Sequence, residues 1–328
     1  MRVLLTGATG FLGNNLLRLL VAEGHEVQLT LRPGAGGRAL AGLKFDPVPG
    51  DLTNVERLLA ESSDFDVLIH AAAMIQIGWS RLVESRQVNV TATERLAEFC
   101  RLKKRRMIHV STVDTLAHAP DGRPRTESDR EPGKPPISYV QSKREAEQKM
   151  LEQIEQGLDG IIIHPGFMLG PWDWKPSSGA MLLAIAGGPT PLAPAGGCSA
   201  VDVRDVADGI LKAVDRGRRG ERYILGGENL SYLELWQKMA RAVGKRNGPR
   251  AKLPNWLAGM AGRVGDLAGK WMRQEPQVNS GATAMGQLQH FYSSEKAISQ
   301  LGYRIGSLDD AIDDEWQFLV EYGYVRKS

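Results

Sequence analysis

The sequence has few of the features that mark secreted, metal-stabilised or membrane-spanning proteins. Only two cysteines occur among its 328 residues, Cys100 and Cys198, and their spacing does not match a zinc motif. We therefore expect no disulfide framework and no metal site, and a reducing compartment such as the cytoplasm fits this cysteine usage. No uninterrupted apolar run is long enough to span a bilayer, and the first residues enter a strand-like run without a signal-peptide pattern.

A strong excess of charge of one sign is also absent. Lys and Arg number 41 against 38 Asp and Glu, a formal net charge of +3, so the overall charge indicates neither a nucleic-acid partner nor an anionic membrane. The densest basic stretch is residues 101–106, which we interpret as a solvated helix end, with a nucleic-acid patch as the alternative. The content of 42% apolar and 24% charged residues is typical of a globular protein and excludes a disordered one.

The first half of the chain alternates short apolar runs with longer helical patterns. The runs predict strands at residues 3–5, 27–31, 66–70, 107–110 and 161–163, and the patterns between them predict helices that include 88–102 and 139–156. Such alternation is typical of an α/β fold with a doubly wound parallel sheet, the Rossmann arrangement.

The composition changes after Pro165, where Gly, Pro, Ala and Trp become frequent, and the last hundred residues read as mostly helical. We therefore predict a dinucleotide-binding domain over residues 1–170, to which residues 201–225 return. Residues 171–200 and 226–328 would form a smaller, mostly helical C-terminal lobe that binds the substrate.

A glycine-rich loop, residues 6–13, lies between the first predicted strand and the first predicted helix. Glycines at positions 7, 10 and 13 allow a sharp turn and a close approach of backbone to a pyrophosphate. The N-terminus of the helix would offer free N–H groups to that anion. A dinucleotide site requires a strand before the loop, a helix after it and a second strand at the expected distance along the chain, and the sequence predicts all three.

The end of the second predicted strand bears on which dinucleotide is bound. An acidic residue there would accept a hydrogen bond from the adenosine ribose and favour NAD, but the strand ends in Arg32 and no carboxylate follows until Asp46. A guanidinium suits a 2′-phosphate, so we predict NADP(H) as the cofactor, with NAD as the alternative if Arg32 only stacks on adenine.

Tyr139 and Lys143 begin a predicted helix and project from one face of it. Ser138 and Gln141 have the spacing of a capping box, which would set the start of this helix. An ammonium beside a phenol lowers the phenol pKa toward the working range, and such a phenol can exchange a proton with a carbonyl or an alcohol.

Ser111 and Thr112 end the strand predicted at residues 107–110, where the ligand crevice of a doubly wound sheet lies. A hydroxyl at that place can bind the reacting oxygen. The alternative for both residues is an ordinary cap of the next turn.

Together these motifs resemble the extended short-chain dehydrogenase/reductase superfamily, also called the NAD-dependent epimerase/dehydratase family, over nearly the whole chain. The pattern is closest to that of dihydroflavonol-reductase-like proteins. Further segments that carry the resemblance are Gly50-Asp51-Leu52, His70-Ala71-Ala72-Ala73, Asn89-Val90, His109-Val110-Ser111-Thr112, His164-Pro165-Gly166-Phe167 and residues 201–207.

The resemblance implies the catalytic residues Thr112, Tyr139 and Lys143. The cofactor contacts that it implies, together with those argued above, are Gly7, Thr9, Gly10, Phe11, Leu12, Gly13, Arg32, Asp51, Leu52, Ala71, Ala72, Ala73, Ser111, Tyr139, Lys143, Pro165, Gly166, Phe167 and Met168.

Three functions stay open on the sequence alone. The first is an NADP(H)-dependent oxidoreductase that moves a hydride to or from a carbonyl or alcohol of a small, largely apolar substrate. The second is a nucleotide-sugar epimerase or dehydratase with tightly bound NAD, although residues 165–171 lack the Asn typical of that branch. The third is a sensor or assembly factor that binds NADP without catalysis, which often lacks the Tyr or the Lys. A homodimer is possible in each case.

Apolar residues recur at helical spacing from Trp256 to Trp271, and we interpret this stripe as facing the core. A membrane-surface helix or a substrate lid is the alternative. Aromatic and Met residues that would suit an apolar substrate, or equally form the core of the smaller lobe, are Phe167, Met168, Trp172, Trp174, Trp256, Met260, Phe291 and Tyr292.

Overall fold

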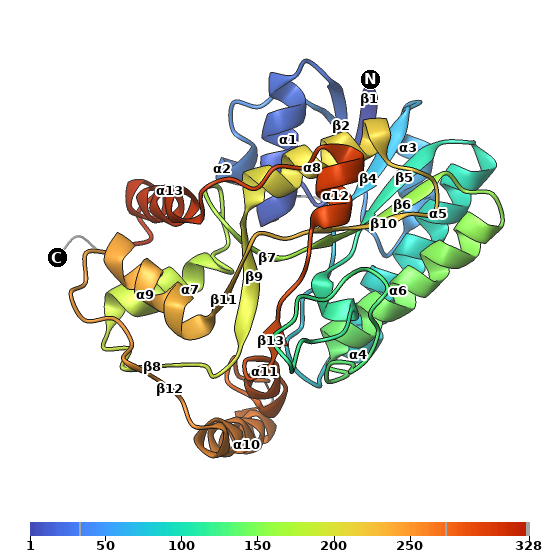
Figure 1. Ribbon diagram of the computed structural model, residues 1–328. Helices are drawn as coiled ribbons and strands as arrows, with labels where there is room; N and C mark the ends of the chain where they lie inside the picture. The colour runs from blue at the N-terminus through green and yellow to red at the C-terminus, as the bar shows by residue number, and fades with distance from the viewer. Residues whose placement is uncertain (33, 273, 326–328) are drawn as a thin grey trace.

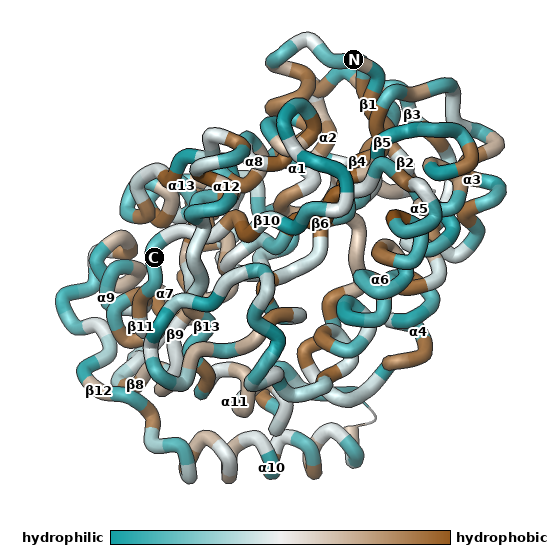
Figure 2. The backbone as a smooth tube through the Cα atoms, turned by 45° about the vertical axis from the view of Figure 1, so that its right-hand side comes forward, coloured by the Kyte–Doolittle hydropathy of each residue, from teal (hydrophilic) through white to brown (hydrophobic). Residues whose placement is uncertain are grey.

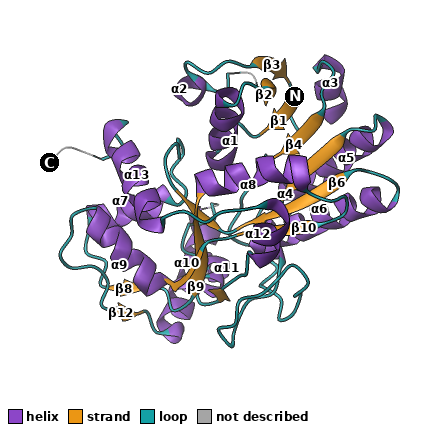
Figure 3. Cartoon of the chain, turned by 45° about the horizontal axis from the view of Figure 1, so that its top comes forward, coloured by secondary structure: helices purple, strands orange, loops and turns teal. Residues whose placement is uncertain are grey.

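The computed structural model describes residues 1–32, 34–272 and 274–325. Its larger part is built on a seven-stranded, all-parallel sheet with the strand order β10-β6-β5-β4-β1-β2-β3 and helices on both faces (Figures 1 and 3). The strands are β1 (Arg2–Thr6), β2 (Glu26–Leu31), β3 (Asp46–Pro49), β4 (Val67–His70), β5 (Arg106–Val110), β6 (Gly160–Pro165) and β10 (Arg222–Leu225). The predicted doubly wound α/β class is confirmed, and the strand order reverses between β1 and β4.

Alternate side chains of each central strand pack on opposite faces of the sheet. Val3 and Leu5 belong to an apolar cluster with α1 (Phe11–Ala22) and α8 (Val203–Arg216), whereas Leu4 belongs to a second cluster. The helices of that second face include α3 (Val55–Glu61), α5 (Ala92–Leu102) and α6 (Ser138–Glu155). Because both faces are covered, strands in this sheet can be apolar at every position, as they are at Ile161, Ile162 and Ile163.

The smaller part is built around β9 (Gly197–Asp202), which pairs with β7 (Phe167–Leu169), β11 (Glu228–Ser231) and β13 (Gln289–His290). Its helices include α7 (Gly179–Gly187), α9 (Tyr232–Ala242) and α13 (Leu308–Glu321), whose apolar faces form a separate core cluster. The remaining elements are α2 (Gly37–Leu40), α4 (Leu82–Arg86), the π-helical turn η1 (Gln87–Thr91), the 3₁₀ turn η2 (Val113–Thr115), β8 (Leu192–Ala193), β12 (Ala251–Lys252), α10 (Asn255–Met272), α11 (Ser280–Met285) and α12 (Glu295–Leu301).

The chain passes between the two parts several times. β7 leaves the end of β6 for the smaller sheet, and α8 and β10 return to the large sheet after β9. Residues 201–225 were predicted to return to the larger domain. Within this range, residues 201–202 end β9 in the smaller sheet, whereas α8 contacts α1 of the larger part. The division into two domains at the predicted boundaries stays a prediction.

The stripe at 256–271 does not face the core, so that interpretation is wrong. In α10 the large apolar side chains other than Leu257 are exposed to solvent, and Trp256 is 65% and Trp271 93% exposed. The helix is packed by its small residues instead, since Ala258 and Gly262 are its buried positions. Among the described residues, no helix is both long enough and apolar enough to cross a bilayer.

Candidate active site

The glycine loop joins β1 to α1 in a turn that larger residues could not form. Gly7 has a φ of 84°, and a Cβ there would lie 2.6 Å from the amide nitrogen of Ala72. A Cβ on Gly13 would overlap the carbonyl of Gly7. Gly10 precedes α1 and supplies no side-chain cap, so the first N–H groups of the helix, at Phe11 and the next residues, keep their capacity to bind an anion. This cradle fits the pyrophosphate of a dinucleotide.

The end of β4 lies directly beside the glycine loop. The Ala72 amide donates to Thr6 Oγ1 at 3.2 Å, and Thr6 Oγ1 lies 2.8 Å from His70 Nδ1. Residues 71–73 therefore line the point where the strand order reverses, which is where doubly wound sheets bind ligands.

The ends of β2 and β3 carry the residues predicted to contact the adenosine half. Arg32 is exposed and forms no ion pair with any described residue. Asp51 Oδ1 accepts a hydrogen bond from the Thr53 amide at 2.8 Å, and Leu52 packs on the core. The guanidinium of Arg38 lies 5.8 Å from the Trp174 ring, so Arg38 is directed toward the smaller part of the protein and not toward Arg32.

Tyr139 and Lys143 lie on the buried face of α6, but the helix does not start as the sequence predicted. The residue before α6 is Ile137, and no capping box forms. The Ser138 hydroxyl donates to the carbonyl of Ser80 at 2.7 Å instead. Backbone carbonyls at positions 76 and 78 accept from the amides of Tyr139 and Ser138, at 3.2 and 2.8 Å. A neighbouring loop, residues 74–81, thus accepts the amide hydrogen bonds that a local capping box would have satisfied. The spacing of residues in the sequence could not predict this contact between distant segments.

The ends of β5 and α6 bring Thr112 and Tyr139 together, so that the Thr112 side chain influences the pKa of Tyr139. Thr112 Oγ1 also accepts from the Asp114 amide at 3.2 Å, so it caps η2 as the alternative reading proposed. Burial, reinforced by the charge of Asp114, raises the pKa of Tyr139 above its usual value of 10.0, although the Thr112 hydrogen bond opposes the rise. The expectation that Lys143 lowers this pKa is wrong for the structure described here.

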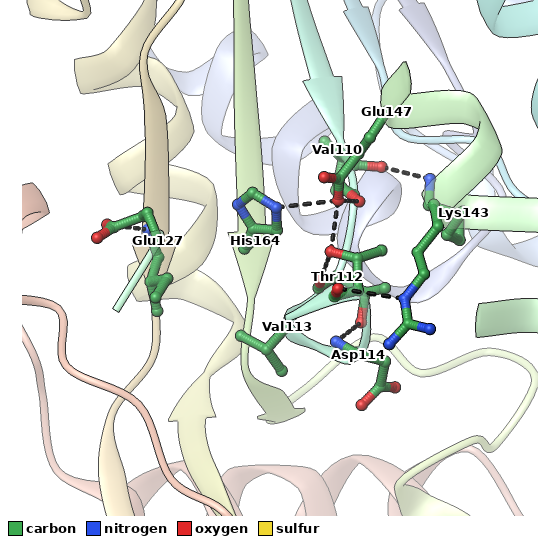
Figure 4. A network of polar contacts seen from close by, with 12 residues as sticks. Val110, Thr112, Val113, Asp114, Glu127, Lys143, Glu147 and His164 are labelled. Atoms are coloured by element: carbon green, nitrogen blue, oxygen red, sulfur yellow. Dashed lines mark hydrogen bonds and ion pairs between the residues drawn. The ribbon is translucent and has the colours of Figure 1, made fainter. Parts of the chain in front are cut away.

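Lys143 is almost wholly buried, and its Nζ donates to the carbonyl of Val110 at 2.8 Å (Figure 4). Burial lowers the pKa of Lys143 to about 8, while the charge of Glu147 acts in the opposite direction. The carbonyl contact fixes the ammonium under the end of β5, next to the residues that end that strand.

A buried carboxylate that the sequence analysis did not select lies one turn beyond Lys143. Glu147 Oε1 accepts from the hydroxyls of Ser111 and Thr115 and lies 2.9 Å from His164 Nε2 (Figure 4). Burial raises the pKa of Glu147, but His164 and the two hydroxyls outweigh it and hold the pKa at about 2. Ser111 is therefore directed into this network and not toward Thr112. The four-residue spacing of Lys143 and Glu147 was the available signal.

A second buried cluster lies behind Thr112 and Tyr139. Lys134 Nζ donates to Asp114 Oδ1 at 2.7 Å and to the carbonyl of Val113 at 3.0 Å, and His290 Nδ1 lies 3.4 Å from Asp114 Oδ1. Burial alone would raise the pKa of Asp114. Lys134 and His290 lower this pKa by more than burial raises it, so the net pKa is well below its usual range. These three residues are far apart in the sequence, and no motif links them.

Asn89 connects the loop at residues 74–81 to α6. Its side chain donates to Ser142 Oγ and to the carbonyl of Met74, each at 2.9 Å, and accepts from the Met74 amide at 2.7 Å. Asn89 lies in the π-helical turn η1, which takes up the first residues of the helix predicted for 88–102.

Pro165, Gly166, Phe167 and Met168 carry the chain from the large sheet to the small one. The Gly166 amide donates to the carbonyl of Leu225 at 3.0 Å, and a Cβ on Gly166 would overlap the carbonyl of Ser199. Phe167 packs against the core of the smaller part and Met168 against that of the larger part.

Several aromatic residues considered for the substrate site are core residues instead. Trp172 and Trp174 pack with Phe318 and Tyr322, and the Trp174 and Tyr322 ring centroids are 4.7 Å apart. Tyr292 is buried and donates to the carbonyls of residues 113 and 117. Among the described residues, no group of three or more His, Cys, Asp or Glu side chains could hold a metal ion.

Comparison with known proteins agrees with this geometry. The model of the NAD dependent epimerase/dehydratase family matches residues 3–226. A putative dihydroflavonol 4-reductase of Synechocystis is 32% identical over 98% of this chain and 95% of its own. Sterol demethylase protein B of Methylococcus capsulatus is 32% identical over 80% of each chain. The crystal structure of gox2253 superimposes with a TM-score of 0.84 at 31% identity and covers 99% of both chains.

A glycine cradle, a Thr-Tyr-Lys group and a doubly wound sheet therefore coincide with a family match over most of the chain. This protein belongs to the NAD-dependent epimerase/dehydratase family of extended short-chain dehydrogenases/reductases and is an NAD(P)-dependent enzyme.

Proposed function

We propose that this protein is an NADP(H)-dependent oxidoreductase that transfers a hydride between the nicotinamide and a carbonyl or alcohol carbon of a small, largely apolar substrate. The observation that carries the proposal is the pairing of Tyr139 with Thr112, with the Lys143 ammonium buried one turn further along the same helix. Thr112, Tyr139 and Lys143 would be the catalytic residues.

The residues present fit a dinucleotide. Gly7, Gly10 and Gly13 would hold the pyrophosphate at the start of α1, because a Cβ at position 7 or 13 would close the cradle. Asp51 and Leu52 would contact adenine, and the exposed guanidinium of Arg32 would bind a 2′-phosphate. The remaining cofactor contacts would come from Thr9, Phe11, Leu12, Ala71, Ala72, Ala73, Ser111, Pro165, Gly166, Phe167 and Met168. The bound cofactor supplies the hydride.

The chain's own residues would hold and move the proton. Since burial raises the pKa of Tyr139 above 10.0, its phenol is protonated at neutral pH and is ready to donate to a carbonyl oxygen in the reductive direction. The Thr112 hydroxyl would donate a second hydrogen bond to the same oxygen. Lys143 would bind the ribose of the cofactor through its ammonium.

An apolar substrate is supported by the loop at residues 74–81. This loop accepts hydrogen bonds from the first amides of α6 and so lies against Tyr139, and it exposes Ile75, Ile77 and Trp79 by 64%, 38% and 47%. Exposed apolar side chains beside a catalytic group are typical of a site for an apolar ligand. The names of the two relatives above, a putative dihydroflavonol 4-reductase and a sterol demethylase protein, point to the same substrate class.

Cofactor titrations and a panel of hydrophobic ketones and aldehydes test the proposal. We expect NADPH to bind at least tenfold more tightly than NADH, and Arg32→Ala to remove this difference. Tyr139→Phe should bind NADPH normally and lose turnover by at least a hundredfold. Tyr303→Phe is the matched control, because Tyr303 is also a buried tyrosine and its hydroxyl donates to the carbonyl of Gly226.

The other two functions give different results. Tightly bound NAD released on denaturation, with no net turnover of the ketone panel, would favour the nucleotide-sugar epimerase or dehydratase. NADPH binding with no turnover of any carbonyl, and with no effect of Tyr139→Phe, would favour a sensor or assembly factor.

A further inference from the structure

Exposed large apolar side chains are concentrated in two segments of this protein. Of the seventeen among the described residues, eleven lie in residues 75–83 or 256–278. The two segments are joined, since Glu275 accepts from the amides of Trp79 and Ser80 at 2.8 and 3.1 Å and the Trp79 indole donates to Ser280 Oγ at 2.8 Å. They therefore form one exposed apolar region, and α10 lies in it at the lower end of the molecule in Figure 2.

The helix α10 presents two opposite faces. Trp256, Met260, Val264, Leu267 and Trp271 follow one another at intervals of four, four, three and four residues, and all are more than half exposed. At about 3.6 residues per turn they form a single stripe along the helix. Figure 2 shows that α10 lies at the edge of the fold, with no other element beyond it.

The inner face of α10 is made of glycines and an alanine. These small residues determine the orientation of the helix about its axis. A Cβ on Gly262 would overlap Thr283 Oγ1, one on Gly265 would overlap the carbonyl of Val278, and one on Gly269 would lie 2.8 Å from a carbon of Pro276. The helix can approach residues 276–283 this closely only on its small-residue face. Rotation to bury the stripe is therefore excluded, and the stripe stays on the outside.

The charges around the stripe are unbalanced. Arg263 and Lys270 are exposed and border it, and further cations precede the helix at positions 246, 250 and 252. The nearby acids are turned toward the protein, because Asp266 accepts from the Ser280 amide at 3.0 Å and Glu275 is held by the loop at 74–81. The near-neutral charge of the whole chain conceals this local excess of positive charge.

We propose that α10 docks this protein on an anionic lipid surface, with the stripe inserted among the acyl chains and the cations at the phosphates. Indole side chains near both ends of the stripe suit the boundary between headgroups and hydrocarbon. A second copy of the chain is the less favoured occupant, because a two-fold contact through the same face would bring identical cations together.

The docked face also lies next to the catalytic residues. Residues 275–281 connect α10 to the loop at 74–81, and that loop accepts the first amides of the helix that carries Tyr139. Resting on the function proposed above, this arrangement opens the substrate site toward the bilayer, where a largely apolar substrate is dissolved.

Vesicle cosedimentation of the full-length protein without cofactor or substrate tests the docking. We expect at least tenfold tighter binding to vesicles of phosphatidylcholine and phosphatidylglycerol at 3:1 than to phosphatidylcholine alone, weakened by salt. Val264→Glu/Leu267→Glu should abolish binding to both, and Arg263→Ala/Lys270→Ala should remove only the preference for the anionic lipid. Ile298→Glu/Ile305→Glu, which changes two other exposed apolar side chains outside this region, is the control that should bind as the wild type does.

Two results would overturn the proposal. One is wild-type binding no better than that of Val264→Glu/Leu267→Glu, with both proteins folded by circular dichroism. The other is a wild-type dimer in lipid-free ultracentrifugation that the same variant converts to a monomer, which would assign the stripe to a second copy. Because Tyr139→Phe should bind vesicles normally, loss of lipid binding and loss of ketone turnover can be told apart.

Discussion

Replacing Glu147 by glutamine should destabilise the protein by an amount that depends on pH. The folded structure holds the pKa of Glu147 at about 2, against an ordinary value of 4.5, because His164, Ser111 and Thr115 favour the charged form more than burial opposes it. At about 1.4 kcal/mol per tenfold change in proton affinity, this difference corresponds to about 3 kcal/mol of folding free energy.

The sign follows from the direction of the shift. Because folding lowers the pKa, the stabilisation is fully present well above pH 4.5 and is lost as the pH falls toward 2. The glutamine variant has no carboxyl at this place to bind a proton. The wild-type advantage over Glu147→Gln should therefore shrink by about 2 kcal/mol between pH 6 and pH 3.

Urea unfolding followed by tryptophan fluorescence at several pH values measures this difference. Glu152→Gln is the matched control, because Glu152 lies on the same helix and pairs with Lys149 at 3.1 Å on the surface, where an ion pair contributes about 1 kcal/mol or less. A gap between wild type and Glu147→Gln that stays constant from pH 6 to pH 3 would refute the assignment of Glu147 as a buried carboxylate held by these three partners.

Three further predictions follow from contacts around the site. Gly13→Ala should weaken NADPH binding at least tenfold in a fluorescence titration, because its Cβ would overlap the Gly7 carbonyl, whereas Gly187→Ala, with open space around it, should not. Lys134→Met should lower the free energy of unfolding by about 3 kcal/mol or more, since it leaves the Asp114 carboxylate without its closest cation. Asn89→Ala should lower kcat for a ketone substrate and cost about 2 kcal/mol of stability, because it releases the loop at 74–81 from α6; unchanged kcat would contradict this role.

Elements whose pattern repeats within a few residues could be predicted from the sequence. The runs at 3–5 and 161–163 are apolar at every position because both faces of the sheet are covered, and the run at 107–110 is apolar except for the buried His109. The glycine loop could be predicted as well, since the turn and the close backbone approach exclude any side chain at positions 7 and 13. Tyr139 and Lys143 share a face of α6 because helical geometry requires it.

Contacts between distant segments were decided only by the tertiary structure. No capping box forms at Ser138, because the carbonyls of residues 76 and 78 accept from the first amides of α6 instead. The pKa of Tyr139 is raised because its burial outweighs the opposing effect of Thr112, while the Lys143 ammonium is held on the Val110 carbonyl. The partners of Glu147 and Asp114 come from segments that no spacing rule connects. The stripe of α10 faces solvent because its glycines permit a closer contact than its large side chains do, and a hydrophobic period alone cannot say which face of a helix finds a neighbour.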